Sequence, residues 1–148
     1  MRPVPNDDYF MKQALQEAQI AFGKGEVPVG AVVACEGKII ARAHNLTETL
    51  NDVTAHAEMQ AITAAASALG GKYLIDCTLY VTVEPCPMCA GALAWAQISR
   101  IVYGADDDKR GFSKLAPKAL HPTTKVAGGI MADESACLMK RFFKELRE

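Results

Sequence analysis

His56-Ala57-Glu58 and Pro85-Cys86-Pro87-Met88-Cys89 are the two stretches of this sequence that decide its fold and indicate its chemistry. Together they offer one imidazole, two thiols and one carboxylate. Zinc binds imidazole nitrogen and thiolate sulfur readily, and three protein ligands leave a fourth tetrahedral position open to water. The pattern therefore predicts a catalytic zinc site, with one ion per chain held by His56, Cys86 and Cys89.

Each stretch stands where a helix is expected to begin. Thr54 is a suitable N-cap for a helix from about residue 55, and Pro85 stands where a second helix, over residues 86–97, would start. At a helix start the backbone dipole favours negative charge, which would promote the thiolate forms of nearby cysteines.

The spacing within each stretch separates ligands from a catalytic group. Cys86 and Cys89 are three residues apart, so one helical face can present both to one ion. Glu58 lies two positions from His56 and projects differently, which predicts proton transfer beside the metal rather than a fourth ligand. A Cys-x-x-Cys pair alone would also fit a redox pair or buried core cysteines. The upstream His-x-Glu favours the metal site.

Hydrophobic periodicity and turn residues divide the chain into alternating helices and strands. Glu36-Gly37 is typical of a tight hairpin turn. Strands alternating with helices predict one α/β domain over residues 1–148, with three α/β/α layers around a central mixed sheet. Residues 105–125 lack an apolar period and are expected to form a long loop at or over the site. Helices are expected over residues 8–22, 55–69, 86–97 and 134–147, and strands over 29–35, 38–43, 78–84 and 100–104.

His-x-Glu followed by Pro-Cys-x-x-Cys is the signature of the zinc nucleobase deaminases. Over nearly its whole length the chain resembles the bacterial tRNA-specific adenosine deaminases, in the cytidine deaminase superfamily. The resemblance implies a cytidine-deaminase-like fold and hydrolytic deamination of adenosine to inosine at the wobble position of tRNA anticodons. The implied partners are a tRNA anticodon stem-loop and a second copy of the chain in a homodimer. The resemblance is carried by residues 26–32 (Glu-Val-Pro-Val-Gly-Ala-Val), Asn45, residues 54–58 and 79–86, and Phe142-Phe143.

The same resemblance implies roles for individual residues. Glu58 would shuttle protons, and Asn45 would hydrogen-bond the base that is flipped into the site. Backbone near Ala57 and Pro85 would surround the amine of that base. Asp107 matches by motif an acidic residue that approaches a ribose 2′-hydroxyl beside the target, the group that distinguishes RNA from DNA.

Two residues depart from the family pattern and leave other substrates open. Pro87 and Trp95 are more similar to bacterial guanine deaminases, whereas residues 26–32 are similar to the tRNA enzymes. One alternative is a deaminase of free guanine, cytosine or a nucleoside. Another, from a different functional class, is a non-catalytic zinc-bearing RNA-binding subunit, and the presence of Glu58 argues against it.

Charge is divided unevenly along the chain, although the net charge is only −1. Residues 1–108 carry 7 basic and 13 acidic side chains, whereas residues 109–148 carry 9 and 4. The basic excess could form a surface for a phosphate backbone, but an ordinary solvated face is the alternative. The nine basic residues are Lys109, Arg110, Lys114, Lys118, Lys125, Lys140, Arg141, Lys144 and Arg147.

Cysteine usage and hydropathy indicate a cytoplasmic protein. The three cysteines outside the motif, Cys35, Cys77 and Cys137, are expected to be reduced core residues because they do not make a disulfide framework. The longest charge-free stretch is residues 85–99, shorter than the roughly 20 residues that span a bilayer. Charged residues 7, 8 and 12 stand where a secretory signal would be apolar.

Overall fold

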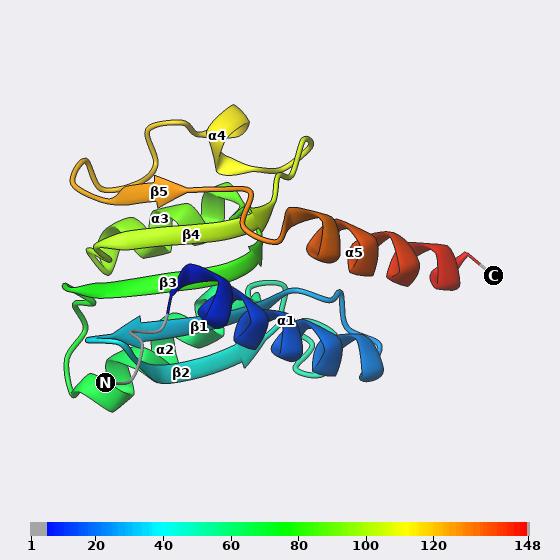
Figure 1. The fold of residues 1–148 in the computed structure, drawn as a ribbon, viewed down its shortest axis with the longest axis horizontal. Coiled ribbons are helices and arrows are strands. Elements are labelled where there is room, and N and C mark those ends of the chain that lie inside the picture. Colours follow the sequence, from blue (N-terminus) through cyan, green and yellow to red (C-terminus); the bar gives the residue numbers. More distant parts are fainter. Residues whose placement is uncertain (1–5, 148) are drawn as a thin grey trace.

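The computed structural model describes residues 6–147, and its centre is a five-stranded mixed sheet with helices on both faces (Figure 1). The strand order is β2-β1-β3-β4-β5, in which β1 runs antiparallel to β2 and β3, and β4 runs parallel to β3 and β5. In chain order the elements are α1 (Asp7–Gly23), β1 (Gly30–Cys35), β2 (Lys38–His44), α2 (Ala57–Leu69), β3 (Cys77–Val83), α3 (Pro87–Trp95), β4 (Arg100–Ala105), α4 (Phe112–Leu115), β5 (Lys125–Ala127) and α5 (Ala132–Leu146).

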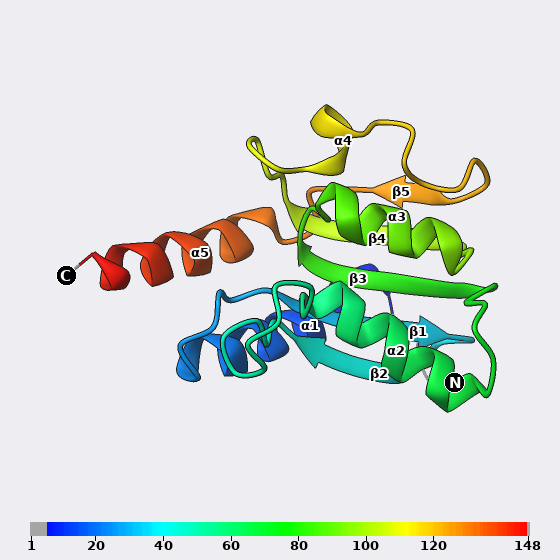
Figure 2. The same ribbon diagram turned by 180° about the vertical axis from the view of Figure 1, so that it is seen from behind.

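Alternate residues of β1 pack into two separate cores, one on each face of the sheet. Ala31 and Val33 join the core under α2 and α3, while Val32 and Ala34 join the core under α1. The period of two is that of a strand buried on both faces. Helices α1 and α5 lie on one face, and α2 and α3 lie on the other (Figures 1 and 2). The predicted three-layer α/β/α fold with a mixed central sheet is confirmed.

The hairpin between β1 and β2 also forms as predicted. Glu36 and Gly37 both have positive φ, 53° and 77°, as the tightest two-residue hairpin turn requires. At the far end of β2 the backbone N–H of Asn45 donates to the Val29 carbonyl at 3.1 Å, which extends the pairing of these strands to the edge of the site.

Helix α2 begins two residues later, and helix α3 one residue later, than the sequence suggested. His56 is the N-cap of α2, and Thr54 does not cap it but donates its hydroxyl to Asp52. Helix α3 starts at Pro87, with Cys86 as its N-cap. The residue before a proline is driven to extended backbone, which is why Cys86 lies outside the helix and Pro87 takes its first position.

Residues 105–125 are less irregular than predicted. The segment contains the one-turn helix α4, and it leads directly into β5, which the sequence analysis missed. Only three residues pair in β5, too few for an alternating pattern to be recognised.

Burial corrects one further expectation. Cys137 was expected in the core but is exposed on α5, whereas Cys77 is buried as predicted. Trp95, at the end of α3, is 85% exposed. The adjacent aromatics behave as their spacing requires, with Phe142 buried and Phe143 41% exposed. Among the described residues no helix is both long enough and apolar enough to cross a membrane.

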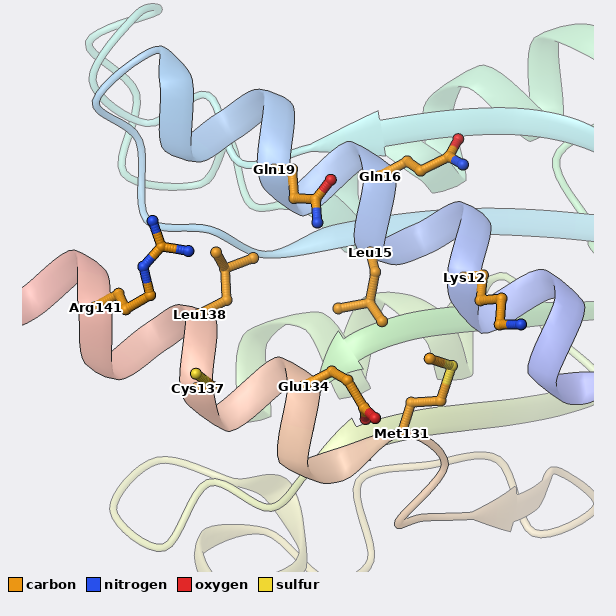
Figure 3. A pocket seen from close by; sticks show the side chains of 9 residues that line it. All are labelled: Lys12, Leu15, Gln16, Gln19, Met131, Glu134, Cys137, Leu138 and Arg141. Carbon is orange, nitrogen blue, oxygen red and sulfur yellow. The ribbon is translucent and has the colours of Figure 1, made fainter.

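A groove of about 480 Å³ runs between α1 and α5 (Figure 3). Leu15 and Leu138 point into it from the two helices, and Lys12 and Arg141 lie toward its ends. It lies on the face of the sheet opposite α2 and α3, away from the motif residues.

The carboxylate of Asp7 binds the start of α1 to strands β3 and β4. Asn6 caps the helix through its side chain, which accepts the Tyr9 N–H at 3.0 Å. Asp7 then accepts two bonds from the Arg100 guanidinium, at 2.8 and 2.7 Å, and one from the Tyr80 hydroxyl at 2.8 Å. The hydrogen bonds from Arg100 lower the pKa of Asp7 below its ordinary value of 3.8, against the opposing effect of burial.

We predict that Asp7→Asn lowers the free energy of unfolding by about 1 kcal/mol at pH 7, because the pair is about one-third exposed and screened by water. A carboxylate with a lowered pKa stabilises the fold above its unfolded pKa, and that contribution is lost as the pH falls through the folded value. The difference between wild type and variant should therefore shrink below pH 3.8. Urea unfolding at several pH values measures it, and a pH-independent difference would contradict the assignment.

Candidate active site

The three predicted ligands meet on one side of the sheet. His56 Nδ1 lies 3.5 Å from Cys89 Sγ and 3.7 Å from Cys86 Sγ. The ligand atoms of all three residues lie within 4.8 Å of one another. Zinc binds nitrogen at about 2.0–2.1 Å and sulfur at about 2.3 Å. At a tetrahedral angle these bonds would place the nitrogen and sulfur atoms about 3.6 Å apart, close to the distances seen here. The donor set and its spacing therefore fit one tetrahedral metal ion.

Convergence of two helix starts explains this arrangement. His56 and Cys86 are the N-caps of α2 and α3, with extended backbone (ψ 156° and 169°), and neither side chain makes a capping hydrogen bond. Their side chains are therefore free to face each other. Helices α2 and α3 lie side by side on the same face and begin at the same end of the sheet (Figure 2). Cys89 completes the group from the first turn of α3 and is fully buried.

The thiols are electrostatically unequal when no metal charge is present. A hydrogen bond with Cys89 lowers the pKa of Cys86 to about 4, against the opposing effect of burial. The same hydrogen bond, together with burial, raises the pKa of Cys89. Hydrogen bonding to Cys86 also raises the pKa of His56. A divalent ion would reverse this preference, because metal ligands bind as thiolates and neutral imidazole.

Glu58 lies beside the ligands without being one of them. It is the second residue of α2 and is only 4% exposed. Burial raises its pKa to about 7. A carboxyl group that titrates near neutral pH next to a metal site is suited to general acid/base chemistry.

The four predicted substrate residues come from different segments of the chain. Ala57 and Pro85 are buried next to the ligands in the chain, and the Pro85 carbonyl accepts the Phe112 N–H at 2.9 Å. Asn45 follows β2, is 6% exposed and donates its side-chain amide to Thr47 at 3.3 Å. Asp107 lies after β4 and is half-buried.

One oxygen of Asp107 is already committed to the local turn. Asp107 Oδ1 accepts the N–H groups of Lys109 and Arg110 at 3.1 and 2.9 Å. Within residues 6–147 the hydrogen bonds to the Asp107 carboxylate reach only Oδ1, which leaves Oδ2 available for a ligand.

Two acidic residues near the site escaped the sequence analysis. Glu26 and Glu84 are buried, and their carboxylates bind the loops on either side of the cluster. Both belong to stretches that carried the family resemblance, but burial of a glutamate gives no sequence signal of its own, since the residue type is usually exposed.

Comparisons with known proteins agree with the geometry. A family model described as MafB19-like deaminase matches residues 5–147. The tRNA-specific adenosine deaminase of Bacillus subtilis (strain 168) is 46% identical over 147 residues, covering 96% of this chain and 91% of the relative. A solved structure from work on A-to-I editing by tRNA:A34 deaminases at the wobble position has a TM-score of 0.82 at 45% identity, covering 88% of this chain and 98% of the other. A guanine deaminase of Bacillus subtilis gives 0.66 at 43% identity, covering 69% and 66%.

We predict that Cys86→Ala abolishes stoichiometric metal binding and lowers the unfolding temperature, because the remaining two ligands cannot hold the ion and its binding stabilises the fold. The matched control is Cys35→Ala, which removes a thiol outside the cluster and should retain the metal. Elemental analysis and thermal unfolding of both variants provide the measurement. Full metal occupancy in Cys86→Ala would show that the ligand set is wrong.

Proposed function

The chain belongs to the MafB19-like deaminases and, within them, to the tRNA-specific adenosine deaminases, and we propose that it converts adenosine to inosine at the wobble position of tRNA anticodons. The observation that carries this proposal is the buried Glu58 beside a His/Cys/Cys group in a chain closely related to such enzymes. A ligand group without an adjacent carboxylate would suit a structural metal site equally well.

We propose that the metal is zinc, one ion per chain, bound by His56, Cys86 and Cys89. Two thiolates and one imidazole are ligands that zinc favours, and three protein ligands are typical of catalytic rather than structural zinc sites. Zinc bound in this way supplies a hydroxide nucleophile near neutral pH.

The protein's own contribution to the chemistry is proton transfer by Glu58. Its carboxylate would accept the proton released from water and deliver it to the amino nitrogen that leaves C6 of adenine. Burial raises the pKa of Glu58 and so favours a carboxyl group that can both take up and release a proton.

Base binding is assigned to Asn45 and to the backbone at Ala57 and Pro85. Asn45 uses its amide nitrogen in the bond to Thr47, and this bond would orient the carbonyl oxygen of the side chain as an acceptor for the flipped base. Ala57 and Pro85 are next to ligands in the chain, where their backbone groups can surround the reacting amine. All three positions are buried, as a site that excludes bulk water requires.

Recognition of RNA is assigned to Asp107 and the basic residues that follow it. All nine basic residues beyond position 108 are exposed, on the segment around α4, on β5 and on α5 and its C-terminal end. These segments lie on different parts of the molecule (Figure 1), so Lys109 and Arg110, which adjoin Asp107, are the residues proposed to contact phosphates beside the target.

We also propose a homodimer. Two large apolar residues of α3 are exposed: Trp95 is 85% exposed and Met88 is 38% exposed. They are seven residues apart, which places them on one helical face. An apolar helix face of this kind fits a second copy of the chain better than water. A monomeric mass by analytical ultracentrifugation of the zinc-loaded protein would contradict the dimer.

A guanine deaminase is the second candidate, favoured by 43% identity to the Bacillus subtilis enzyme over 69% of this chain. One parallel assay separates the two. The zinc-loaded protein is incubated with an anticodon stem-loop carrying wobble adenosine, with free guanine, and with free adenosine, cytosine and cytidine. Inosine should appear in the stem-loop, while xanthine from guanine should be slight. Equal turnover of free base and stem-loop would favour the small-molecule enzyme, and no turnover at all would favour a non-catalytic RNA-binding subunit.

We predict that Glu58→Ala keeps zinc and stem-loop binding but lowers kcat by roughly 10²–10⁴-fold, because the carboxylate moves protons and does not bind the metal. Glu48→Ala, which removes an exposed carboxylate from the preceding loop, is the control and should retain activity. Single-turnover deamination and zinc content are the measurements. A variant with a tenth of the wild-type rate would contradict the assigned role.

Asp107→Asn should reduce discrimination between the stem-loop and its version with 2′-deoxyribose beside the target. The turn should persist, because the asparagine oxygen can accept the same two N–H groups. The remaining NH₂ is a donor only and cannot accept a bond from the 2′-hydroxyl.

Neutralising Lys109 and Arg110 together should instead weaken binding to any sequence. It should also reduce the slope of log affinity against log salt concentration by about one for each phosphate contact that is lost. Affinity that is insensitive to salt would argue against RNA as the substrate.

A further inference from the structure

Glu26 and Glu84 bind the loops beside the metal-ligand group in the same way. Glu26 is 0% exposed and Glu84 is 5% exposed. In each, one carboxylate oxygen accepts a single backbone N–H, and the other accepts both the N–H and the hydroxyl of one residue. Burying a carboxylate is costly unless several donors converge on it, so this repeated arrangement calls for a function beyond filling the core.

Glu84 holds the segment that carries Asp107. Its Oε1 accepts the Asp107 N–H at 3.1 Å, and its Oε2 accepts the Ser113 N–H at 3.0 Å and the Ser113 hydroxyl at 2.6 Å. A Cβ at Gly111 would overlap this carboxylate, so only glycine lets the segment approach so closely. These hydrogen bonds hold residues 107–113 against Glu84, which lies two positions before Cys86 in the chain.

Glu26 does the same for the loop between β2 and α2. Its Oε1 accepts the Glu48 N–H at 3.0 Å, and its Oε2 accepts the Thr49 N–H and hydroxyl, both at 2.6 Å. Burial alone would raise the pKa of Glu26, but the hydrogen bonds from Thr49 and Glu48 outweigh it and lower the pKa, so the carboxylate stays charged.

This second loop connects two site residues. It begins after Asn45, whose amide bonds to Thr47, and it ends at His56. A backbone bond of 2.9 Å from Leu46 to Ala55 closes its base. Glu26 therefore fixes the far part of a closed loop whose two ends are the proposed base-binding residue and a metal ligand.

We propose that Glu26 and Glu84 are positioning residues that hold the two loops of the active site in their reactive geometry. Their carboxylates act through the loops and not on the substrate. For what each loop meets, the inference rests on the proposed function: Glu26 sets the position of Asn45 against the base, and Glu84 sets the position of Asp107 against the ribose. Small displacements of such groups lower rates strongly, because reaction depends on near-attack geometry.

Removing one hydroxyl group that donates to Glu26, and one that donates to Glu84, tests the proposal with little disturbance of the fold. Thr49→Val and Ser113→Ala keep the backbone N–H bonds and remove one bond to the glutamate. Thr54→Val and Thr124→Val are the controls, since each removes a hydroxyl bond without touching Glu26 or Glu84. Thr54 lies in the same loop as Thr49, and Thr124 lies on the segment that follows α4.

The expected result has three parts. All four variants keep about one zinc per chain and unfold at similar temperatures. Amide hydrogen exchange accelerates at residues 48–49 in Thr49→Val and at residues 107 and 113 in Ser113→Ala, but not in the controls. Thr49→Val lowers kcat on the stem-loop and Ser113→Ala raises KM, each by about tenfold, the equivalent of one lost bond to a charged acceptor.

The stronger variants Glu26→Gln and Glu84→Gln place an NH₂ group against converging donors and should enlarge the same effects. If they lose zinc or fail to fold, the hydroxyl variants alone decide. The proposal would be overturned if hydrogen exchange were unchanged in Thr49→Val and Ser113→Ala. It would also be overturned if kcat and KM changed as much in the controls as in these two variants. If wild type itself does not deaminate the stem-loop, the proposed function fails, and hydrogen exchange still tests whether the two glutamates hold the loops.

Discussion

The structure depends on one constraint: two helices must begin at the same end of the sheet, close enough for their N-cap side chains to meet. The parallel β3-α3-β4 unit places the start of α3 beyond the end of β3, and the β1-β2 hairpin returns the chain so that α2 begins beside it. N-cap residues have extended backbone and side chains free of the helix, so His56 and Cys86 can face each other. The three side chains of the proposed metal site then come from two helix starts rather than from one flexible loop.

The second level of organisation lies in the loops. Neither the 46–55 loop nor the 106–113 segment belongs to the sheet, and backbone N–H groups at their turns need partners. Buried Glu26 and Glu84 supply those partners with charged oxygens, which make stronger bonds than carbonyls do. The site thus combines a rigid scaffold for the metal ligands with two tethered loops for the groups assigned to the substrate.

Much of this could be read from the sequence, because the signals were local. The His-x-Glu and Cys-x-x-Cys spacings predicted the ligand cluster, Glu36-Gly37 predicted the hairpin, and alternating periods predicted the layers. A proline also marks the start of α3, but it is Pro87 rather than Pro85, the proline from which the start was predicted. What escaped prediction depends on tertiary packing: three residues pairing in β5, the exposure of Cys137, and the burial of two glutamates whose partners lie more than twenty residues away.

X-ray absorption at the zinc edge of the purified, active protein would decide whether the His56, Cys86 and Cys89 group is a catalytic zinc site, because it reports the ligands and the open position together. We expect two sulfur atoms at about 2.3 Å, one nitrogen at about 2.0–2.1 Å and one further light atom from water, which substrate or an inhibitor should perturb. A closed shell of four protein ligands that does not respond to the stem-loop would contradict a catalytic metal site.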